Sequence, residues 1–240
     1  MVQDYTMKKP QLINDFIYHI FNRGVEKRKT FLEKGDFVRF IRDLYEFNDE
    51  DAVINLSYHF NPKTIEVEPR YIKKEQKKRK LLVDILAFVL MPNHFHLILR
   101  QLKENGISRF MQKLGTGYTM YFNKKNDRVG SLFQGRYKAV MVKEEPHFIF
   151  LPSYIHLNPI KLYRGSTSIN SMLRFLEDYK WSSLPDYLGK KNFPSVTSRD
   201  FFSDYFGGKG AYHSEIKDLL KGKMKRYLPV IDEVKLDADF

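Results

Sequence analysis

A run of apolar residues, interrupted once by a turn signal, constrains the fold of this chain most. The sequence is apolar from Leu82 to Met91 apart from Asp84, and it is apolar again over residues 97–99. Pro92-Asn93 separates the two runs. Because Pro-Asn favours a turn, the pattern predicts a β-hairpin whose second strand begins directly after it.

Two histidines stand at the start of this second strand, one residue apart. Alternate residues of a strand share one face, so we expect His94 and His96 to point the same way and Phe95 the opposite way. Two adjacent imidazoles on a rigid strand make half of a metal site, and a third ligand is needed to complete it. The alternative is a pair of partly buried histidines that make ordinary hydrogen bonds.

Strand and helix patterns alternate along the first two thirds of the chain. Aromatic and β-branched residues predict a strand over 16–21, and apolar residues at helical spacing predict helices over 36–48 and 108–125. Residues 131–142 are interpreted as a further strand, and Glu144-Glu145-Pro146 opens a last helix. The order β-α-β-β-α-β predicts an α+β fold, a ferredoxin-like sandwich with an antiparallel sheet and helices on one face. The other face is expected to be free to bind a partner.

The patterns also suggest how the chain is divided. Residues 15–165 form the predicted main domain, and a basic stretch at about 57–81 interrupts it. This insertion is interpreted either as a solvated loop or as a segment that contacts phosphates. Ser166-Thr167-Ser168 has the composition of a linker, and residues 166–240 are expected to form a C-terminal helical extension.

Charge and composition narrow the class of partner. A formal net charge of +12 over 240 residues makes nucleic acid the expected partner. The absence of cysteine excludes disulfides, zinc–cysteine sites and thiol catalysis. There is no signal-peptide pattern and no apolar run of about 18 residues, so we expect a cytoplasmic protein that does not contact a membrane.

A second pair of polar residues lies in the last predicted helix. Tyr154 and Asn158 are four residues apart, so on a helix they share one face, one turn from each other. Taken alone, they could be a core tyrosine and a C-terminal cap. Pro152 precedes the tyrosine by two residues and is expected either to kink the helix or to start a new turn.

The combination of His-x-His on a strand with Tyr-x-x-x-Asn on a later helix resembles the HUH superfamily, whose signature is a histidine pair with a nucleophilic tyrosine. More narrowly, the chain resembles the IS200-like single-tyrosine (Y1) transposases, and among them the REP-associated tyrosine transposases (RAYTs). Four stretches carry this resemblance in chain order: His19-Ile20-Phe21-Asn22-Arg23-Gly24, Leu90-Met91-Pro92-Asn93-His94-Phe95-His96-Leu97, Phe133-Gln134-Gly135-Arg136-Tyr137-Lys138 and Tyr154-Ile155-His156-Leu157-Asn158-Pro159.

The resemblance implies an activity and a site. Residues 15–165 would be the catalytic domain of a transposase that cleaves and rejoins single-stranded DNA at hairpins, such as REP-like hairpins or insertion-sequence ends. Tyr154 would attack a phosphodiester and form a 5′-phosphotyrosine. His94 and His96, with the amide oxygen of Asn158, would hold Mg²⁺ or Mn²⁺, ions that suit oxygen and imidazole ligands.

The resemblance is less specific about DNA contacts and assembly. Arg23, Arg136 and Lys138 lie in the matching stretches and are the candidates for phosphate contacts. Both a monomer and a homodimer are compatible with the family.

Two other functions stay open at this stage. The protein could be a domesticated relative that binds hairpin DNA without cleaving it, although such a binder has no use for His94, His96, Tyr154 and Asn158 together. It could also be a metal-dependent phosphodiesterase that uses water as nucleophile, but no carboxylate or histidine base is evident beside the His pair. Formation of a covalent protein–DNA adduct distinguishes the transferase from both.

Overall fold

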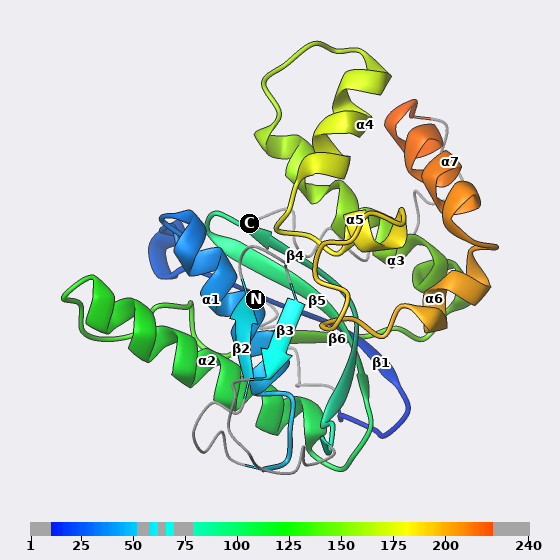
Figure 1. Ribbon diagram of the computed structural model, residues 1–240. Helices are drawn as coiled ribbons and strands as arrows, with labels where there is room; N and C mark the ends of the chain where they lie inside the picture. The colour runs from blue at the N-terminus through cyan, green and yellow to red at the C-terminus, as the bar shows by residue number, and fades with distance from the viewer. Residues whose placement is uncertain (1–10, 52–57, 62–65, 70–78, 223–240) are drawn as a thin grey trace, which may run out of the picture.

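A computed structural model describes residues 11–51, 58–61, 66–69 and 79–222 of the chain (Figure 1). The strands are β1 (Ile17–Arg23), β2 (Tyr58–Asn61), β3 (Glu66–Pro69), β4 (Val83–Met91), β5 (His94–Gln101) and β6 (Lys138–Met141). The helices are α1 (Lys34–Glu46), α2 (Gly106–Lys125), α3 (Glu145–Leu157), α4 (Ile169–Asp178), α5 (Leu184–Tyr187), α6 (Asp200–Tyr205) and α7 (Lys209–Leu220). Two short 3₁₀ helices, η1 (Val25–Lys27) and η2 (Asn158–Leu162), complete the set.

The main sheet has the strand order β4-β5-β1-β6, and all of its pairings are antiparallel. β4 and β5 form the hairpin predicted around Pro92-Asn93, with Met91 paired to His94. With α1 after β1 and α2 after β5, this order is that of a ferredoxin-like sandwich. The predicted α+β fold is therefore confirmed.

The last strand is shorter than predicted. We expected a strand over 131–142, but only Lys138–Met141 pairs regularly with β1. Gly135 has φ +71°, a left-handed conformation that interrupts an extended chain. The preceding residues still follow the end of β1, because Phe133 forms an isolated bridge with Gly24.

One face of the sheet packs against α1 and α2, which lie beside each other in Figure 1. Phe40 of α1 and Tyr118 of α2 are fully buried there, and their rings meet edge to face at 4.9 Å. Phe95 points into the same core, with its ring 5.1 Å from that of Phe40. The predicted orientation of Phe95 is thus confirmed.

The opposite face of the sheet is covered as well, so the expectation that it would be free is wrong. Val89 and Ile98 pack there against Leu151 and Ile155 of α3 within a second buried cluster. The same cluster includes Tyr212 of α7, so the extension contributes to it directly. An apolar strand pair buried on both faces requires this second layer, because either face left open would expose a large apolar area.

The chain after α4 also covers the outer edge of β4. The Leu90 N–H donates to the Trp181 carbonyl at 2.8 Å, and the Ser183 N–H donates to the Phe88 carbonyl at 3.0 Å. Farther along, the Ser198 N–H donates to the Ile85 carbonyl at 2.9 Å. These bonds satisfy an edge that would otherwise be open to pairing with another chain. The extension is helical, as expected, while the division at residue 165 stays a prediction.

Much of the predicted basic insertion lies outside the described residues. Within it, β2 and β3 form a two-stranded antiparallel sheet. Its lysine-rich part, at 70–78, is not described, and its role stays a prediction. Across the described ranges, no helix is both long and apolar enough to cross a membrane.

The position of Phe95 leads to a first prediction. Phe95→Ala removes a ring that is 2% exposed and contacts Phe40 and Phe133. We expect the free energy of unfolding to fall by about 3–5 kcal/mol, because the lost burial is accompanied by a cavity. Urea denaturation followed by circular dichroism measures this change.

The control is Phe16→Ala, at a 45% exposed ring, which should change stability by less than about 0.5 kcal/mol. Equal effects of the two variants would contradict the assignment of Phe95 to the core.

Candidate functional site

The register of the sheet gathers the predicted polar residues on the face that α3 covers. His94 on β5 lies opposite Arg23 on β1, and His96 lies opposite Phe21. Phe21 in turn lies opposite Lys138 on β6. Directly paired residues of an antiparallel sheet share one face, so these five side chains form two neighbouring rows.

The two histidines form a rigid pair. Their ring centroids are 5.1 Å apart, with planes nearly perpendicular at 88°. Nδ1 of His94 contacts Oδ1 of Asn93 at 2.7 Å, so this nitrogen carries the proton, because an amide oxygen can only accept. Nε2 of His94 is therefore the nitrogen suited to bind a metal.

α3 brings Tyr154 against this pair. Its ring lies edge-on to those of His96 and His19, with centroids 6.3 and 6.4 Å away. The Phe150 ring, one turn earlier on α3, lies 6.1 Å from it. The helix runs continuously from Glu145 to Leu157 with Pro152 inside it, so of the two alternatives predicted at Pro152 the new turn is absent.

Asn158 ends α3 one turn after Tyr154, as the spacing predicts. Its Nδ2 donates to the Tyr154 carbonyl at 3.2 Å, which turns the amide oxygen away from the helix. That oxygen accepts a hydrogen bond of 3.3 Å from Nζ of Lys161. Asn158 is 3% exposed, so its amide is held in place rather than mobile in solvent.

Sequence reasoning assigned no role to His19. Nε2 of His19 lies 3.0 Å from Nδ1 of His96, and the two rings stack at 5.1 Å. One of these nitrogens donates the shared proton, and the contact directs Nε2 of His96 away from His19. The sequence offered one indication of a role for His19, its place in the matching stretch 19–24. Its contact with His96, 77 positions away, becomes visible only in the fold.

Lys161 was also missed. Beyond its bond to Asn158, its positive charge lowers the pKa of both His94 and His96. It lies three residues after Asn158, within η2, so its position follows from the way α3 ends. A cation that hydrogen-bonds the amide and lowers the pKa of both imidazoles marks this as a place where negative charge is stabilised.

The histidines of the site are neutral at physiological pH. Burial, with a smaller contribution from His147, lowers the pKa of His19 to about 3. Burial, Lys161 and Arg23 lower the pKa of His94 to about 4. The pKa of His96 lies well below its ordinary value, chiefly because of burial and then because of His19, His94 and Lys161.

A divalent ion fits this donor set on chemical grounds. Metals bind the neutral imidazole, the form that the lowered pKa values maintain, and the amide oxygen of Asn158 adds a hard ligand. In the described ranges, no three His, Cys, Asp or Glu side chains are grouped so that they could hold a metal. The donors predicted from the sequence are His94, His96 and Asn158. The positive charges of Arg23 and Lys161 oppose a lone cation, and a phosphate beside it would offset them.

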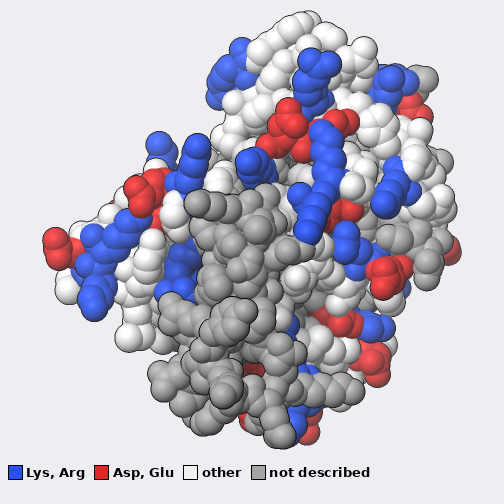
Figure 2. All heavy atoms as spheres, viewed as in Figure 1, with Lys and Arg blue, Asp and Glu red and all other residues white. Residues whose placement is uncertain are grey.

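The structure separates the three predicted DNA contacts. Nε of Arg23 donates to Oε1 of Gln134 at 2.6 Å, and the charge of this arginine helps to lower the pKa of His94. Lys138 is exposed at the edge of the sheet, with Nζ 5.8 Å from the centre of the Phe21 ring. Arg136 instead lines a cavity of about 760 Å³ beside α2, whose lining includes none of the residues around Tyr154. The face in Figure 2 shows Lys and Arg interspersed with Asp and Glu over α1, α2 and the extension.

One family model matches part of this chain. Residues 55–158 match the family model described as transposase, IS200-like, a stretch that covers less than half of the chain. The chain resembles the IS200-like transposases. This confirms the resemblance predicted from the sequence, and the matched stretch includes His94, His96, Tyr154 and Asn158.

Other comparisons add less. A search of curated proteins finds no match. Among solved structures, the chain is similar to a REP-associated tyrosine transposase bound to a REP hairpin, with 12% sequence identity and a TM-score of 0.48. That match covers 80% of this chain and 90% of the other. The roles of the individual site residues rest on the geometry of this chain and on its likeness to the IS200-like transposases.

The lowered pKa values predict acid sensitivity. In the unfolded chain these imidazoles take up protons near pH 6.5, whereas folded His19, His94 and the buried His156, whose pKa burial lowers to about 3, stay neutral. Below pH 6.5 the unfolded state therefore binds more protons, and each histidine costs about 1.4 kcal/mol of stability per pH unit. Asp43, whose pKa burial raises to about 7, gains a proton on folding and offsets about one histidine.

The net expectation is a loss of several kcal/mol between pH 7.5 and 5, measured by urea denaturation in EDTA. Phe16→Ala, which removes an exposed ring and no titratable group, serves as the control and should keep the same pH dependence. Constant stability over this range would contradict the neutral, buried state of the histidines.

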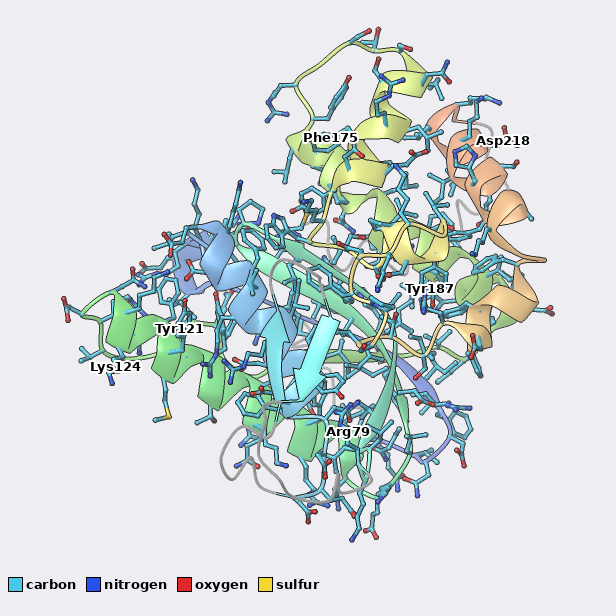
Figure 3. All side chains as sticks on the ribbon, in the orientation of Figure 1. Arg79, Tyr121, Lys124, Phe175, Tyr187 and Asp218 are labelled. Atoms are coloured by element: carbon cyan, nitrogen blue, oxygen red, sulfur yellow. The ribbon has the colours of Figure 1, made fainter. Side chains whose placement is uncertain are left out.

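The charge of Lys161 yields a separate prediction. Lys161→Gln should tighten binding of Mn²⁺ in the absence of DNA by about fivefold, or ~1 kcal/mol, because a repelling charge is removed from the donor set. Electron paramagnetic resonance of free Mn²⁺ measures this affinity. The matched control is Lys124→Gln on α2, labelled in Figure 3, on the far side of the sheet. An unchanged or weaker affinity in Lys161→Gln would remove Lys161 from the site.

Proposed function

We propose that this protein is a DNA transposase that cleaves and rejoins single strands at hairpin-flanked sites through a 5′-phosphotyrosine at Tyr154. The observation that carries the proposal is that the ring of Tyr154 lies 6.3 Å from the ring of His96, which forms a pair with His94. The match of residues 55–158 to IS200-like transposases supports it, since this stretch contains all of these side chains.

In the proposed reaction, Oη of Tyr154 attacks the phosphorus of a phosphodiester. The Oη–P bond forms as the P–O3′ bond breaks, the phenol loses its proton, and the leaving oxygen takes one up as a 3′-OH. A second strand with a free 3′-OH reverses these steps and releases the tyrosine. The bond energy is stored in the phosphotyrosine, so joining requires no nucleotide cofactor.

A phenol with a pKa near 10 needs help to react at neutral pH. In the proposal, His94, His96 and Asn158 hold Mg²⁺ or Mn²⁺, which when bound neutralises and orients the scissile phosphate. Lys161 adds a positive charge beside the same phosphate. His19 keeps the His96 ring in one orientation through the 3.0 Å contact between their nitrogens.

DNA binding follows from charge and position. Arg23 and Lys138 share the face of the site and are proposed to contact phosphates on either side of the scissile bond. Arg136 is proposed to contact a phosphate farther away, beside the cavity next to α2. The partner is single-stranded DNA with hairpins, met in the cytoplasm, and the protein acts as a monomer or a homodimer.

A covalent adduct tests this function. The protein is mixed with labelled single-stranded DNA that carries hairpins from around its own gene, in Mn²⁺ or Mg²⁺, and the products are separated under denaturing conditions. We expect a protein–DNA band that is lost in Tyr154→Phe, which removes the nucleophilic oxygen, and in EDTA.

Tyr163→Phe is the matched control, because Tyr163 lies just after η2 with its ring against Phe175 of α4, and the band should persist. Persistence of the band in Tyr154→Phe would move the nucleophile elsewhere. Tight hairpin binding by the wild type without any band would favour a domesticated binding protein.

A further inference from the structure

The side of α3 that faces away from the His pair is tied to the C-terminal extension. Ser153 and His156 flank Tyr154 in the sequence and are fully buried. Helix geometry turns both side chains away from Tyr154 by 100° or more. Their side chains hydrogen-bond Ser183, Tyr212 and Glu215, which lie beyond the stretch that matches the IS200-like transposases.

We infer that His156 and Tyr212 are positioning residues, which hold the helix that carries Tyr154 in register with the His pair. This inference rests on the proposed function of Tyr154. Neither residue touches the reacting atoms in it; they act through the backbone of α3.

His156 is held at both ring nitrogens. Nδ1 lies 2.7 Å from the Tyr212 hydroxyl of α7, and Nε2 lies 2.7 Å from Oγ of Ser183. Oγ of Ser183 already accepts the Phe88 N–H at 2.9 Å and is placed to donate to the Phe88 carbonyl. Every group is satisfied if Nε2 of His156 donates to Ser183 and Tyr212 donates to Nδ1.

This network reaches the strand next to the His pair. Ser183 binds both polar groups of Phe88 on β4, through its side chain and its own N–H. The next residue, Val89, pairs with His96 on β5. The hydrogen bond from His156 to Ser183 and the bonds from Ser183 to Phe88 therefore connect α3 with β4, one residue before the position that pairs with His96.

A second contact holds the same helix from α7. Oγ of Ser153 donates to Oε1 of Glu215 at 2.9 Å. The ring of Tyr187, labelled in Figure 3 where α3, α5 and α6 meet, lies 5.4 Å from His156 and 5.7 Å from Tyr212. These rings keep water from competing for the polar groups.

Pro152 explains why α3 needs such contacts. Proline has no N–H, so the helix lacks one internal hydrogen bond immediately before Ser153. Helices bend most readily at such a point. The network acts just after it, on Ser153 and His156, and so determines the direction of the last turn, which carries Tyr154. A displacement of about 1 Å at a reacting atom can cost about 100-fold in rate.

The experiment compares two tyrosines of the extension that each lose a hydroxyl. Tyr212→Phe keeps the ring but leaves Nδ1 of His156 without its donor. Tyr179→Phe is the matched control, because its hydroxyl donates to the Leu90 carbonyl of β4 at 2.7 Å. For each variant we measure unfolding free energy, affinity for hairpin DNA and the single-turnover rate of adduct formation at saturating DNA.

Two results together are expected. Tyr212→Phe slows adduct formation at least about tenfold with DNA affinity within about twofold of wild type. Tyr179→Phe, with a similar loss of stability, keeps the wild-type rate. Equal rates in the two variants, or a loss in Tyr212→Phe that is confined to DNA affinity, would overturn the inference.

A readout without DNA separates this inference from the proposed function. With 3-fluorotyrosine at position 154, the ¹⁹F resonance should shift or split in Tyr212→Phe and stay unchanged in Tyr179→Phe. This holds even if the wild type forms no adduct, in which case the proposed function fails while positioning by Tyr212 stands. An unchanged resonance in Tyr212→Phe would overturn the positioning role directly.

Discussion

Burial of the β4–β5 hairpin on both faces is the constraint on which the rest of the structure depends. One face requires α1 and α2, and the other requires α3 and helices of the extension. The outer edge of β4 is covered in turn by residues 179–198. Because the histidine pair begins the second strand of this hairpin, the same burial that stabilises the fold also holds the two imidazoles rigidly.

The electrostatics of the site follow from that burial. Removing the imidazoles from water disfavours their charged forms, and Lys161 and Arg23 disfavour them further. The result is a group of neutral nitrogen donors with cations close by. Such a site is poorly suited to a lone metal ion but well suited to a metal ion together with a phosphate, which agrees with the proposed DNA chemistry.

The extension is integrated with the main sheet and α3, since it supplies buried side chains to the same core. Tyr212 and Ser183 hydrogen-bond His156 of α3, and Ser183 joins that helix to β4. In a helix that contains Pro152, contacts of this kind decide which way the last turn points. The described part of the extension is thereby linked to the proposed chemistry through α3.

Local periodicity allowed much of this protein to be predicted from its sequence. Strand alternation placed His94 and His96 on one face and Phe95 on the other, and helix spacing placed Asn158 one turn after Tyr154. Only the tertiary structure decided that His19 contacts His96, that Lys161 reaches Asn158, and that Tyr212 binds His156. The first and last of these join residues 77 and 56 positions apart, and the second depends on how the chain turns after α3. Periodicity describes which residues share a face of one element. Contacts such as these depend on how separate elements pack together, and local sequence patterns carry no information about that packing.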